Sequence, residues 1–368
     1  MNKKLLAVAV AAALAAPLAA NADSGNVKIS GDLKVSVDSL DNGNTRNLNA
    51  SSNSSHIQFN GDEDLGNGLK AIWQLDTEIG LGSTGPVTTN AQNTLTNRNS
   101  FLGLAGGFGV AIVGKHDTPV KLLGAKVDLF RDQIGDNRNL ISDTSKSAGW
   151  DLRPSNVIAY ISPTFSGVHG AIAYVTNVND TVSAAAAGAL PVGYSLGAAA
   201  DNSVTAWSGL VVYEGGPATV GAGYEKHNLS KLAAGVNDEK IWRLVGGYSF
   251  GDAKVTGLYQ KESDILGSSN GRKVWGLGAA YKMGATTLKG QYYKADSADN
   301  NDQSGAKMFA LGADYALSKR TVAYVAYDKT SNDTNANFTA FGTGHGDNPG
   351  VATGKNGSGI SLGMTHSF

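Results

Sequence analysis

The stretch VKISGDLKVSVD, residues 27–38, alternates strictly between two kinds of side chain. Apolar residues and one glycine occupy the odd positions, and charged or hydroxyl-bearing residues occupy the even ones. A period of two is that of a β-strand with one apolar and one wet face. The stretch is long for a soluble strand and close to the ~9–11 residues that cross a bilayer at a tilt. It therefore predicts a membrane-crossing strand.

The same alternation recurs to the end of the chain and predicts sixteen strands in all. The further strands are expected near residues 56–62, 69–78, 99–105, 110–115, 156–162, 169–176, 204–213, 219–226, 241–250, 253–261, 273–281, 286–294, 308–317, 321–329 and 359–368. A single-chain bacterial outer-membrane barrel needs an even number of strands when both chain ends lie on the same side. The pattern therefore predicts an all-β fold, a 16-stranded antiparallel transmembrane β-barrel.

The predicted connections alternate between very short and long. The short ones include DLGNG at Asp64, GGFG at Gly106 and SKR at Ser318, whereas long polar stretches cover residues 39–55, 177–203, 229–239 and 330–358. Short periplasmic turns on one side and long external loops on the other are typical of outer-membrane barrels. Tyr and Trp residues near the strand ends fit the aromatic girdles of such barrels, although aromatics also favour strands in general.

Composition supports this class and argues against others. The chain has no cysteine, 48 glycines and only 8 prolines, which fits many strands with tight turns. Its formal net charge is -1, and loss of a leader with two lysines would make it -3. Nucleic-acid binding usually needs a clearly basic face, so we expect no nucleic-acid partner.

The first 22 residues have the pattern of a cleaved export signal. Lys3 and Lys4 precede an alanine-rich apolar run, and Ala20-Asn21-Ala22 offers a small-residue cleavage site. The alternative is an anchoring helix, but the apolar run is short of the ~20 residues that a span needs. We expect residues 23–368 to form one barrel domain.

The longest polar segment with a small apolar centre lies between two predicted strands. It is KHDTPVKLLGAKVDLFRDQIGDNRNLISDTSKSAGWDLRP, residues 115–154. A structureless connection of this length is usually a functional loop or disorder. Val127, Leu129, Phe130 and Ile134 could fix it to a wall. We therefore expect residues 116–154 to fold inward and narrow the barrel.

Several segments, spread along the chain and in the correct order, resemble one protein family. They are GDEDLGNGLKAIWQLDTE from Gly61, NSFLGLAGGFGVAIVGKHDTP from Asn99, DLFRDQIGDNRN from Asp128, RPSNVIAYISPTFSG from Arg153, YALSKRTVAYVAY from Tyr315 and the terminal GMTHSF. The chain resembles a Gram-negative general diffusion porin of the trimeric, sixteen-stranded type, in its neisserial and betaproteobacterial branch. The resemblance implies a homotrimer in the outer membrane, contacts with its lipid and lipopolysaccharide, and one water-filled pore per subunit for passive diffusion of ions and small hydrophilic solutes.

The final strand carries a second resemblance. Phe368 ends an alternating strand that places Ile360, Leu362 and Met364 on the same face. This ending is similar to the signal read by the barrel-assembly machinery, a further expected partner, although His366 stands where that pattern usually has an aromatic residue.

The resemblance also implies where the pore is narrowest. In the family, basic wall residues face acidic groups on the inward loop, and such lining charges govern selectivity. Carried over, the acidic side comes from Asp117, Asp128, Asp132 and Asp136, and the basic side from Lys28, Lys34, Lys70, Arg98 and Lys115. For each residue the alternative is an ordinary solvated lumen or loop charge. Alternation also directs Asp32, Gln58, Gln74, Asp76, Arg243 and Lys289 into the lumen.

Other functions have weaker support in the sequence. An enzyme is disfavoured because the six histidines are scattered and no GxSxG or HExxH signature occurs. We expect no cofactor and no metal site. A substrate-specific channel or an adhesin, with residues 177–203 and 331–357 as a binding surface, is a further alternative. The total charge favours cations and a lysine-rich wall favours anions, so we expect weak ion selectivity of either sign.

Overall fold

The computed structural model describes residues 27–81, 95–142, 149–178, 204–231, 235–342 and 344–368. The expected export signal lies outside these residues. The strands are β1 (Lys28–Asp41), β2 (Arg46–Ser52), β3 (His56–Gly66), β4 (Leu69–Glu78), β5 (Ser100–Gly106), β6 (Gly109–Lys115), β7 (Val157–Ile161), β8 (Val168–Val175), β9 (Ala206–Gly215), β10 (Ala218–His227), β11 (Glu239–Phe250), β12 (Ala253–Ser263), β13 (Gly271–Met283), β14 (Thr286–Ala295), β15 (Ala306–Ala316), β16 (Thr321–Asn332) and β17 (Gly357–Ser367). The helices are α2 (Pro119–Ala125), α3 (Arg138–Ile141), η1 (Leu229–Lys231) and η2 (Ile265–Gly267).

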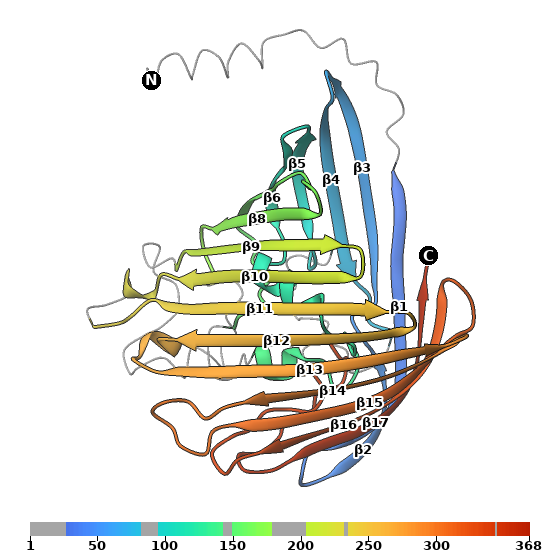
Figure 1. Ribbon diagram of the computed structural model, residues 1–368, viewed down its shortest axis with the longest axis vertical. Helices are drawn as coiled ribbons and strands as arrows, with labels where there is room; N and C mark the ends of the chain where they lie inside the picture. Colours follow the sequence, from blue (N-terminus) through green and yellow to red (C-terminus); the bar gives the residue numbers. More distant parts are fainter. Residues whose placement is uncertain (1–26, 82–94, 143–148, 179–203, 232–234, 343) are drawn as a thin grey trace.

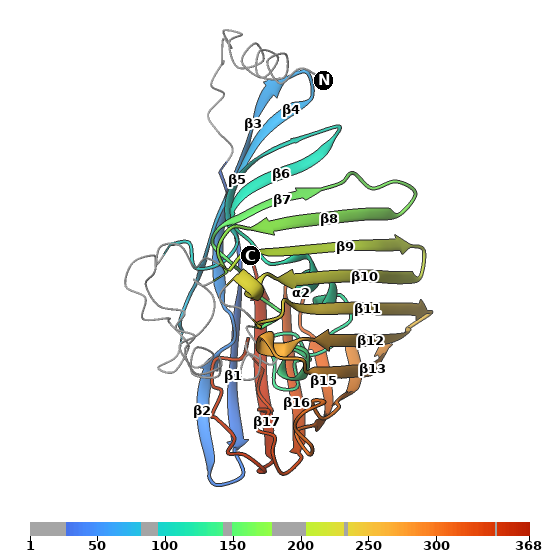
Figure 2. The same ribbon diagram turned by 90° about the vertical axis from the view of Figure 1, so that its left-hand side faces the viewer.

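The strands form one antiparallel sheet that closes on itself. From β3 to β17 each strand pairs with the next along the chain, and β1 completes the ring by pairing with β17, for example Val35 opposite Met364. Figures 1 and 2 show the first strand, in blue, beside the last, in red. Closure leaves no open sheet edge, which is the condition for a sheet to cross a membrane.

The barrel has sixteen strand positions although the strands number seventeen, because β2 and β3 share one position. The C-terminal half of β1 pairs with β2, from Val35 opposite Ser52 to Asp41 opposite Arg46. The other half pairs with β3, from Lys28 opposite Asn60 to Asp32 opposite His56. Asn53, Ser54 and Ser55 interrupt the strand, with Ser54 at a φ of 54°. The predicted sixteen-stranded barrel is confirmed.

The expected long loop at residues 39–55 is wrong. The structure continues β1 to Asp41, turns within residues 42–45, and returns as β2. The sequence RNLNASS of β2 contains only two apolar residues, Leu48 and Ala50, and Leu48 is 77% exposed. Backbone pairing with β1, and not burial of an apolar face, defines this strand.

The two ends of the barrel differ as predicted. At the short-turn end, only Asn67 and Gly68 link β3 to β4, Gly107 and Phe108 link β5 to β6, and Gly251 and Asp252 link β11 to β12. The connections after β4, β6, β8, β10, β12, β14 and β16 are longer and begin at the other end. The start of β1 and the end of β17 therefore both lie at the short-turn end, because these two strands pair with each other and each runs the full wall.

The outer face of the wall is apolar around the barrel. Leu102, Val113, Val220, Leu277 and Leu362 are each more than half exposed. Ile360, Met364 and Phe368 lie on the same face as Leu362, as the alternation predicts. The backbone of Phe368 also pairs with Gly31 of β1. A continuous exposed apolar band is the surface that a barrel presents to lipid.

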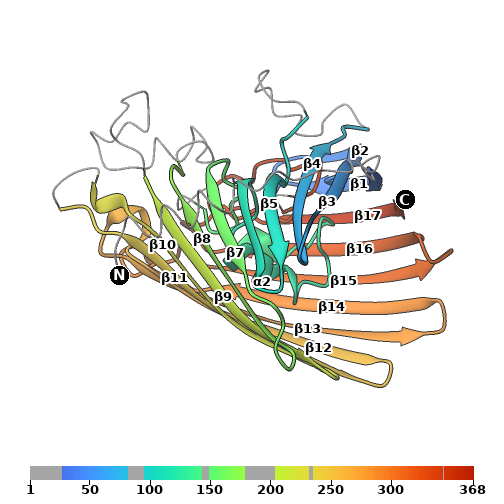
Figure 3. The ribbon, with the colours of Figure 1, turned by 90° about the horizontal axis from the view of Figure 1, so that it is seen from above.

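Residues 116–156 form the constriction loop, and its described parts, residues 116–142 and 149–156, lie inside the barrel. Figure 3 shows α2 enclosed by the ring of strands. Leu123, Val127, Leu140 and Ile141 pack on inward side chains of β9 to β14, and Phe130 and Ile134 pack on β1, β15 and β16. The predicted apolar anchors are confirmed, with Leu129 only partly buried. No helix among the described residues is long and apolar enough to cross a bilayer.

Candidate functional site

Arg243 fixes the beginning and the end of the constriction loop to the wall. Its side chain points inward from β11 and is fully buried. The guanidinium donates to the Val120 carbonyl oxygen at 2.8 Å and to Asp151 Oδ1 at 2.7 Å, both in the loop. Gly124 permits this approach, because a Cβ there would lie 2.7 Å from Arg243 Nη1. Arg243 is thus a lumen residue, as predicted, but the loop covers it.

Lys289 holds the middle of the loop in a similar way. From β14 its ammonium donates to Gln133 Oε1 at 3.0 Å, pairs with Asp314 at 2.9 Å, and lies 4.7 Å from the centre of the Phe130 ring. Gln133 and Phe130 belong to the loop. The contact combines an ion pair with a cation–π interaction, which desolvation strengthens.

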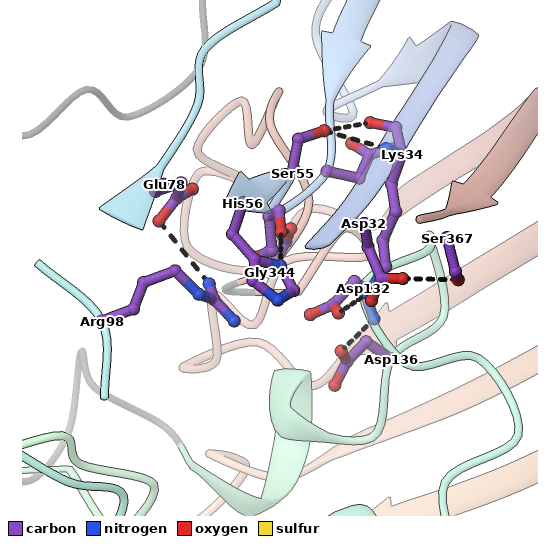
Figure 4. A network of polar contacts seen from close by, with 12 residues as sticks. Asp32, Lys34, Ser55, His56, Glu78, Arg98, Asp132, Asp136, Gly344 and Ser367 are labelled. Atoms are coloured by element: carbon purple, nitrogen blue, oxygen red, sulfur yellow. Dashed lines mark hydrogen bonds and ion pairs between the residues drawn. The ribbon is translucent and has the colours of Figure 1, made fainter. Parts of the chain in front are cut away.

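Lys34 and Asp132 connect the wall directly to the loop. Lys34 Nζ on β1 lies 2.9 Å from Asp132 Oδ2, and Arg138 Nη2 lies 2.7 Å from Asp132 Oδ1. Asp136 accepts the Asp132 backbone N–H at 2.8 Å and also binds Arg138. Figure 4 shows Lys34 directed at Asp132, with Asp136 beside it. The Arg138 and Lys34 charges hold the pKa of Asp132 below its usual range despite burial, so this carboxylate stays ionised.

Arg98, in the segment before β5, is a second basic residue close to Lys34 and Asp132. It lies 3.5 Å from Asp76 and 3.8 Å from Glu78, both on β4. Figure 4 shows Arg98 and Glu78 on one side of His56, with Asp132 and Lys34 on the other. The Glu78 carboxyl lies within electrostatic range of both Arg98 and Asp132. These residues form the eyelet, defined here as Asp32, Lys34, Asp76, Glu78, Arg98, Asp132, Asp136 and Arg138.

Asp117 lies at the base of the loop and is held within it. Lys121 Nζ and Arg153 Nε each lie 2.8 Å from Asp117 Oδ1. Burial disfavours the charged form, but Lys121 and Arg153 together hold the pKa of Asp117 well below its usual range. Burial, with Arg153 nearby, lowers the pKa of Lys121 to about 8. Arg153 and Lys121 are thus ordered by Asp117 and extend the row of basic groups beside the eyelet.

Asp128 lies on the side of the loop that contacts β14. Its Oδ1 accepts from Gln291 Nε2 at 2.9 Å and from the Phe130 N–H at 3.0 Å. Burial raises its pKa to about 8, and the charge of Asp136 adds to that shift. At neutral pH Asp128 is therefore mainly uncharged and supplies little field to the pore.

Three of the expected basic residues lie elsewhere. Lys70 follows the β3–β4 turn at the short-turn end and pairs with Asp62 at 2.7 Å. Lys28 begins β1 at that same end. On β6, Ala111 and Val113 are exposed on the outer face of the wall, and Lys115 is the next residue on that face by alternation. The structure therefore brings Lys34 and Arg98 to the eyelet together with Asp132 and Asp136, but not these three lysines.

Sequence reasoning did not assign Arg138, Arg153 and Lys121 to the site. Their charges were visible, but only the fold of the loop shows which carboxylates they contact. The sequence predicted the last long external connection, but not that the described part of it, residues 333–342 and 344–356, packs on the constriction loop. Ala340 accepts from the Gly135 N–H at 3.1 Å, and Thr339 Oγ1 donates to Asn139 Oδ1 at 2.6 Å.

Both the sequence of this chain and its closed barrel with an inner loop match known proteins. Residues 7–335 match the family model described as Gram-negative porin. The chain belongs to the Gram-negative porin family. It is 31% identical over 258 residues to the major outer membrane protein P.IB of Neisseria lactamica, covering 67% of this chain and 70% of the relative. The P.IB protein of Neisseria gonorrhoeae is 31% identical over 282 residues, covering 74% of each chain.

A solved structure agrees with the fold. The anion-selective porin from Comamonas acidovorans matches with a TM-score of 0.75 at 26% identity, covering 94% of this chain and 100% of that chain. The protein is thus an outer-membrane porin that forms a water-filled channel for passive diffusion of ions and small hydrophilic solutes. Its short-turn end is the periplasmic end and its long-loop end is the external end.

Proposed function

We propose that the eyelet, together with Asp117, Lys121, Arg153 and Arg131, an exposed loop residue within electrostatic range of Asp132, sets the selectivity of the channel and gives it a weak preference for anions. Six basic side chains stand against six acidic ones, Asp32, Asp76, Glu78, Asp117, Asp132 and Asp136. This balance supports weak selectivity. The sign of the preference depends on which side chain of each ion pair is more exposed to water.

The observation that carries the proposal is that most acidic groups are covered by their basic partners. Lys34 is 19% exposed against 6% for Asp132, and Arg138 is 15% exposed against 0% for Asp136. Arg98, Lys121 and Arg153 are also more exposed than the carboxylates of Asp76 and Asp117, and Arg131 is exposed. Asp32 and Glu78 are instead more exposed than their basic partners Lys34 and Arg98, so the expected anion preference is weak. The anion-selective Comamonas porin supports the same sign.

The test is the zero-current potential of the purified protein in a lipid bilayer under a KCl gradient. We expect a small potential of the sign that indicates chloride permeation over potassium. A cation-selective potential would contradict the proposal, because it would show that Asp32 and Glu78 dominate the field.

We further propose that the protein is a homotrimer that uses the wall around β17 and β1 as its subunit interface. There the outer face is aliphatic, with Val37, Ile360, Leu362 and Met364 exposed. The wall from β9 to β16 instead carries aromatic residues near both ends, such as Trp242 and Tyr248 on β11. Aromatic residues near both ends of the strands mark a lipid interface, whereas around β17 and β1 Phe368 lies near the short-turn end and the outer face beyond it is aliphatic. This wall is therefore the candidate for protein contact.

The oligomer can be tested by the mass of the detergent-solubilised protein. We expect three chains per particle, and Leu362→Arg should yield monomers that still conduct as single channels. A monomeric wild-type protein would contradict the proposed assembly without affecting the channel itself.

A further inference from the structure

The wall is interrupted between β2 and β3, at Asn53, Ser54 and Ser55. These polar residues are buried, with exposed fractions of 1%, 8% and 0%. Ser54 has a φ of 54°, in the left-handed region that costs free energy for a residue with a side chain. Buried polar groups normally have hydrogen-bond partners, and a strained backbone persists only where its surroundings hold it. The contacts of these three residues therefore indicate the role of the interruption.

Residues 344–346 of the last external connection lie on this interruption, and we call them the inserted segment. Ser54 Oγ donates to the Gly344 carbonyl oxygen at 3.0 Å, and the Gly346 N–H donates to Asn53 Oδ1 at 2.9 Å. Both hydrogen bonds use polar side chains that are buried at the interruption. The interruption is therefore a docking site for the inserted segment.

His345, in the centre of the inserted segment, contacts β1. It is 2% exposed, its Nε2 lies 3.3 Å from Asp38 Oδ2, and its Nδ1 donates to the Asp347 carbonyl oxygen at 2.7 Å. The third residue of the interruption, Ser55, accepts the Lys34 N–H through its Oγ at 2.9 Å. The interruption thus holds the inserted segment and the eyelet residue Lys34 at one place in the wall.

The inserted segment and the glycine before it also lie against the constriction loop. A Cβ at Gly344 would overlap Arg138 Nη2 and Asp132 Oδ1, so the backbone of Gly344 packs directly on this ion pair. Figure 4 shows Gly344 beside Asp132 in the eyelet. At Gly342, which has a φ of 69°, a Cβ would lie 2.8 Å from Asp136 Cβ. Glycine at both positions lets the backbone of the connection cover Asp132 and Asp136.

We propose that the inserted segment determines the selectivity of the channel by positioning the eyelet, a role that rests on the anion preference proposed above. It keeps Asp132 paired with Arg138 and shields the side chains of Asp132 and Asp136, which are 6% and 0% exposed. Withdrawal of the segment would expose both carboxylates and leave a gap between β1 and the constriction loop. Exposed carboxylates in the narrow part of a pore favour cations. The channel would then be wider and less anion-selective.

The first test compares Gly344→Ala with Gly350→Ala by the zero-current potential of the full-length protein in a KCl gradient. Both glycines belong to the last external connection and neither has a left-handed φ, but a Cβ at Gly350 would meet no atom within 4 Å. A Cβ at Gly344 has to move Arg138 and Asp132 apart or withdraw the segment. The potential of Gly344→Ala should therefore shift toward cation preference, whereas that of Gly350→Ala should match the wild type.

A second variant, Asn53→Ala/Ser54→Ala, removes the two side-chain hydrogen bonds to the inserted segment and carries the test if Gly344→Ala does not assemble. We expect the same shift and a larger single-channel conductance, whereas Asn47→Ala, exposed on β2, should change neither. A segment that only stabilises the fold would lower the unfolding temperature of both variants and leave their potentials at the wild-type value, which would overturn the inference. A cation-selective wild type with both variants shifted as expected would overturn the proposed anion preference alone and support the positioning role.

Discussion

At the residue scale, the eyelet is held by direct ion pairs. The family resemblance implied basic and acidic groups facing each other across a gap, whereas Lys34 Nζ lies 2.9 Å from Asp132. Each eyelet charge therefore has two effects: it contributes to the field that ions meet, and it holds the loop in place. A substitution at Lys34 should reveal both effects.

Lys34→Gln should make the channel less anion-selective and increase its conductance. The change removes a partly exposed positive charge and leaves Asp132 with Arg138 as its remaining basic partner. The zero-current potential in a KCl gradient should move toward cation preference, by more than in Lys70→Gln. Lys70 is the matched control because its pair with Asp62 lies at the periplasmic end. Equal shifts of the zero-current potential in the two variants would show that Lys34 affects selectivity no more than a lysine outside the eyelet does.

Asp128 gives the loop a defined pH dependence. In the folded protein its pKa is raised to about 8, whereas an unfolded aspartate titrates near its model value of 3.8. The docked loop therefore binds one more proton between these values, and docking weakens as pH rises through this window and levels off above about 8. Open-channel noise should grow from pH 6 to 9, and Asp128→Asn should remove this dependence. Noise that is flat with pH in the wild type would contradict this assignment.

The sequence was sufficient for the residue types of the site but not for their contacts. Alternation placed Lys34 on the lumen side of β1, and the apolar anchors of the loop were evident from Phe130 and Ile134. Which carboxylate meets Lys34 depends on a loop whose Asp132 adopts a φ of 62°, and no periodicity encodes such a turn. For Lys70 and Lys115 the sequence predicted the residue type and the strand correctly. It did not show that Lys70 lies at the short-turn end of the barrel and Lys115 on its outer face, and these positions keep both lysines away from the eyelet.

At the element scale, the constriction loop is a docked element with its own buried core. Arg243 is its principal polar anchor, because it contacts both Val120 and Asp151 from the wall. Breaking a buried ion pair by removing one partner typically costs about 3–5 kcal/mol, since the other charge is left uncompensated. That cost would fall on loop docking, because the barrel strands are held by backbone pairing.

Arg243→Gln should release the loop without unfolding the barrel. We expect single-channel steps that are noisier and larger than those of the wild type, together with faster proteolysis within residues 119–142. Lys240→Gln, on the outer face of the same strand, is the control and should leave both readings unchanged. Quiet channels of wild-type size in Arg243→Gln would show that the apolar contacts hold the loop by themselves.

The strand β2 and the packing of the last external connection were not predicted from the sequence, and both have one physical cause. β2 and the connection at residues 333–356 both lie beyond the apolar band, where strands and loops need no alternating face. Their order comes from contacts distant in sequence, such as the hydrogen bond from the Gly346 N–H to Asn53 Oδ1 at 2.9 Å. The membrane-crossing strands were predictable because lipid outside and water inside impose a strict period of two.

At the scale of the whole molecule, the protein is one closed barrel with three functional surfaces. Its interior holds the constriction loop and the eyelet, its aliphatic wall around β1 and β17 is the proposed subunit interface, and its aromatic wall meets lipid. Closure of β1 on β17 makes the pore independent of any partner chain, so the interface can be altered without abolishing conduction.

The most direct test of this account is the single-channel conductance of the unboiled wild-type protein in a planar bilayer over a range of KCl concentrations. We predict steps grouped in threes whose size rises in proportion to bulk salt, as expected of a water-filled pore per subunit. Absence of conductance from a correctly folded oligomer, or conductance that saturates at low salt, would contradict it. The first result would mean that the docked loop seals the barrel, and the second that ions bind in it instead of diffusing through water.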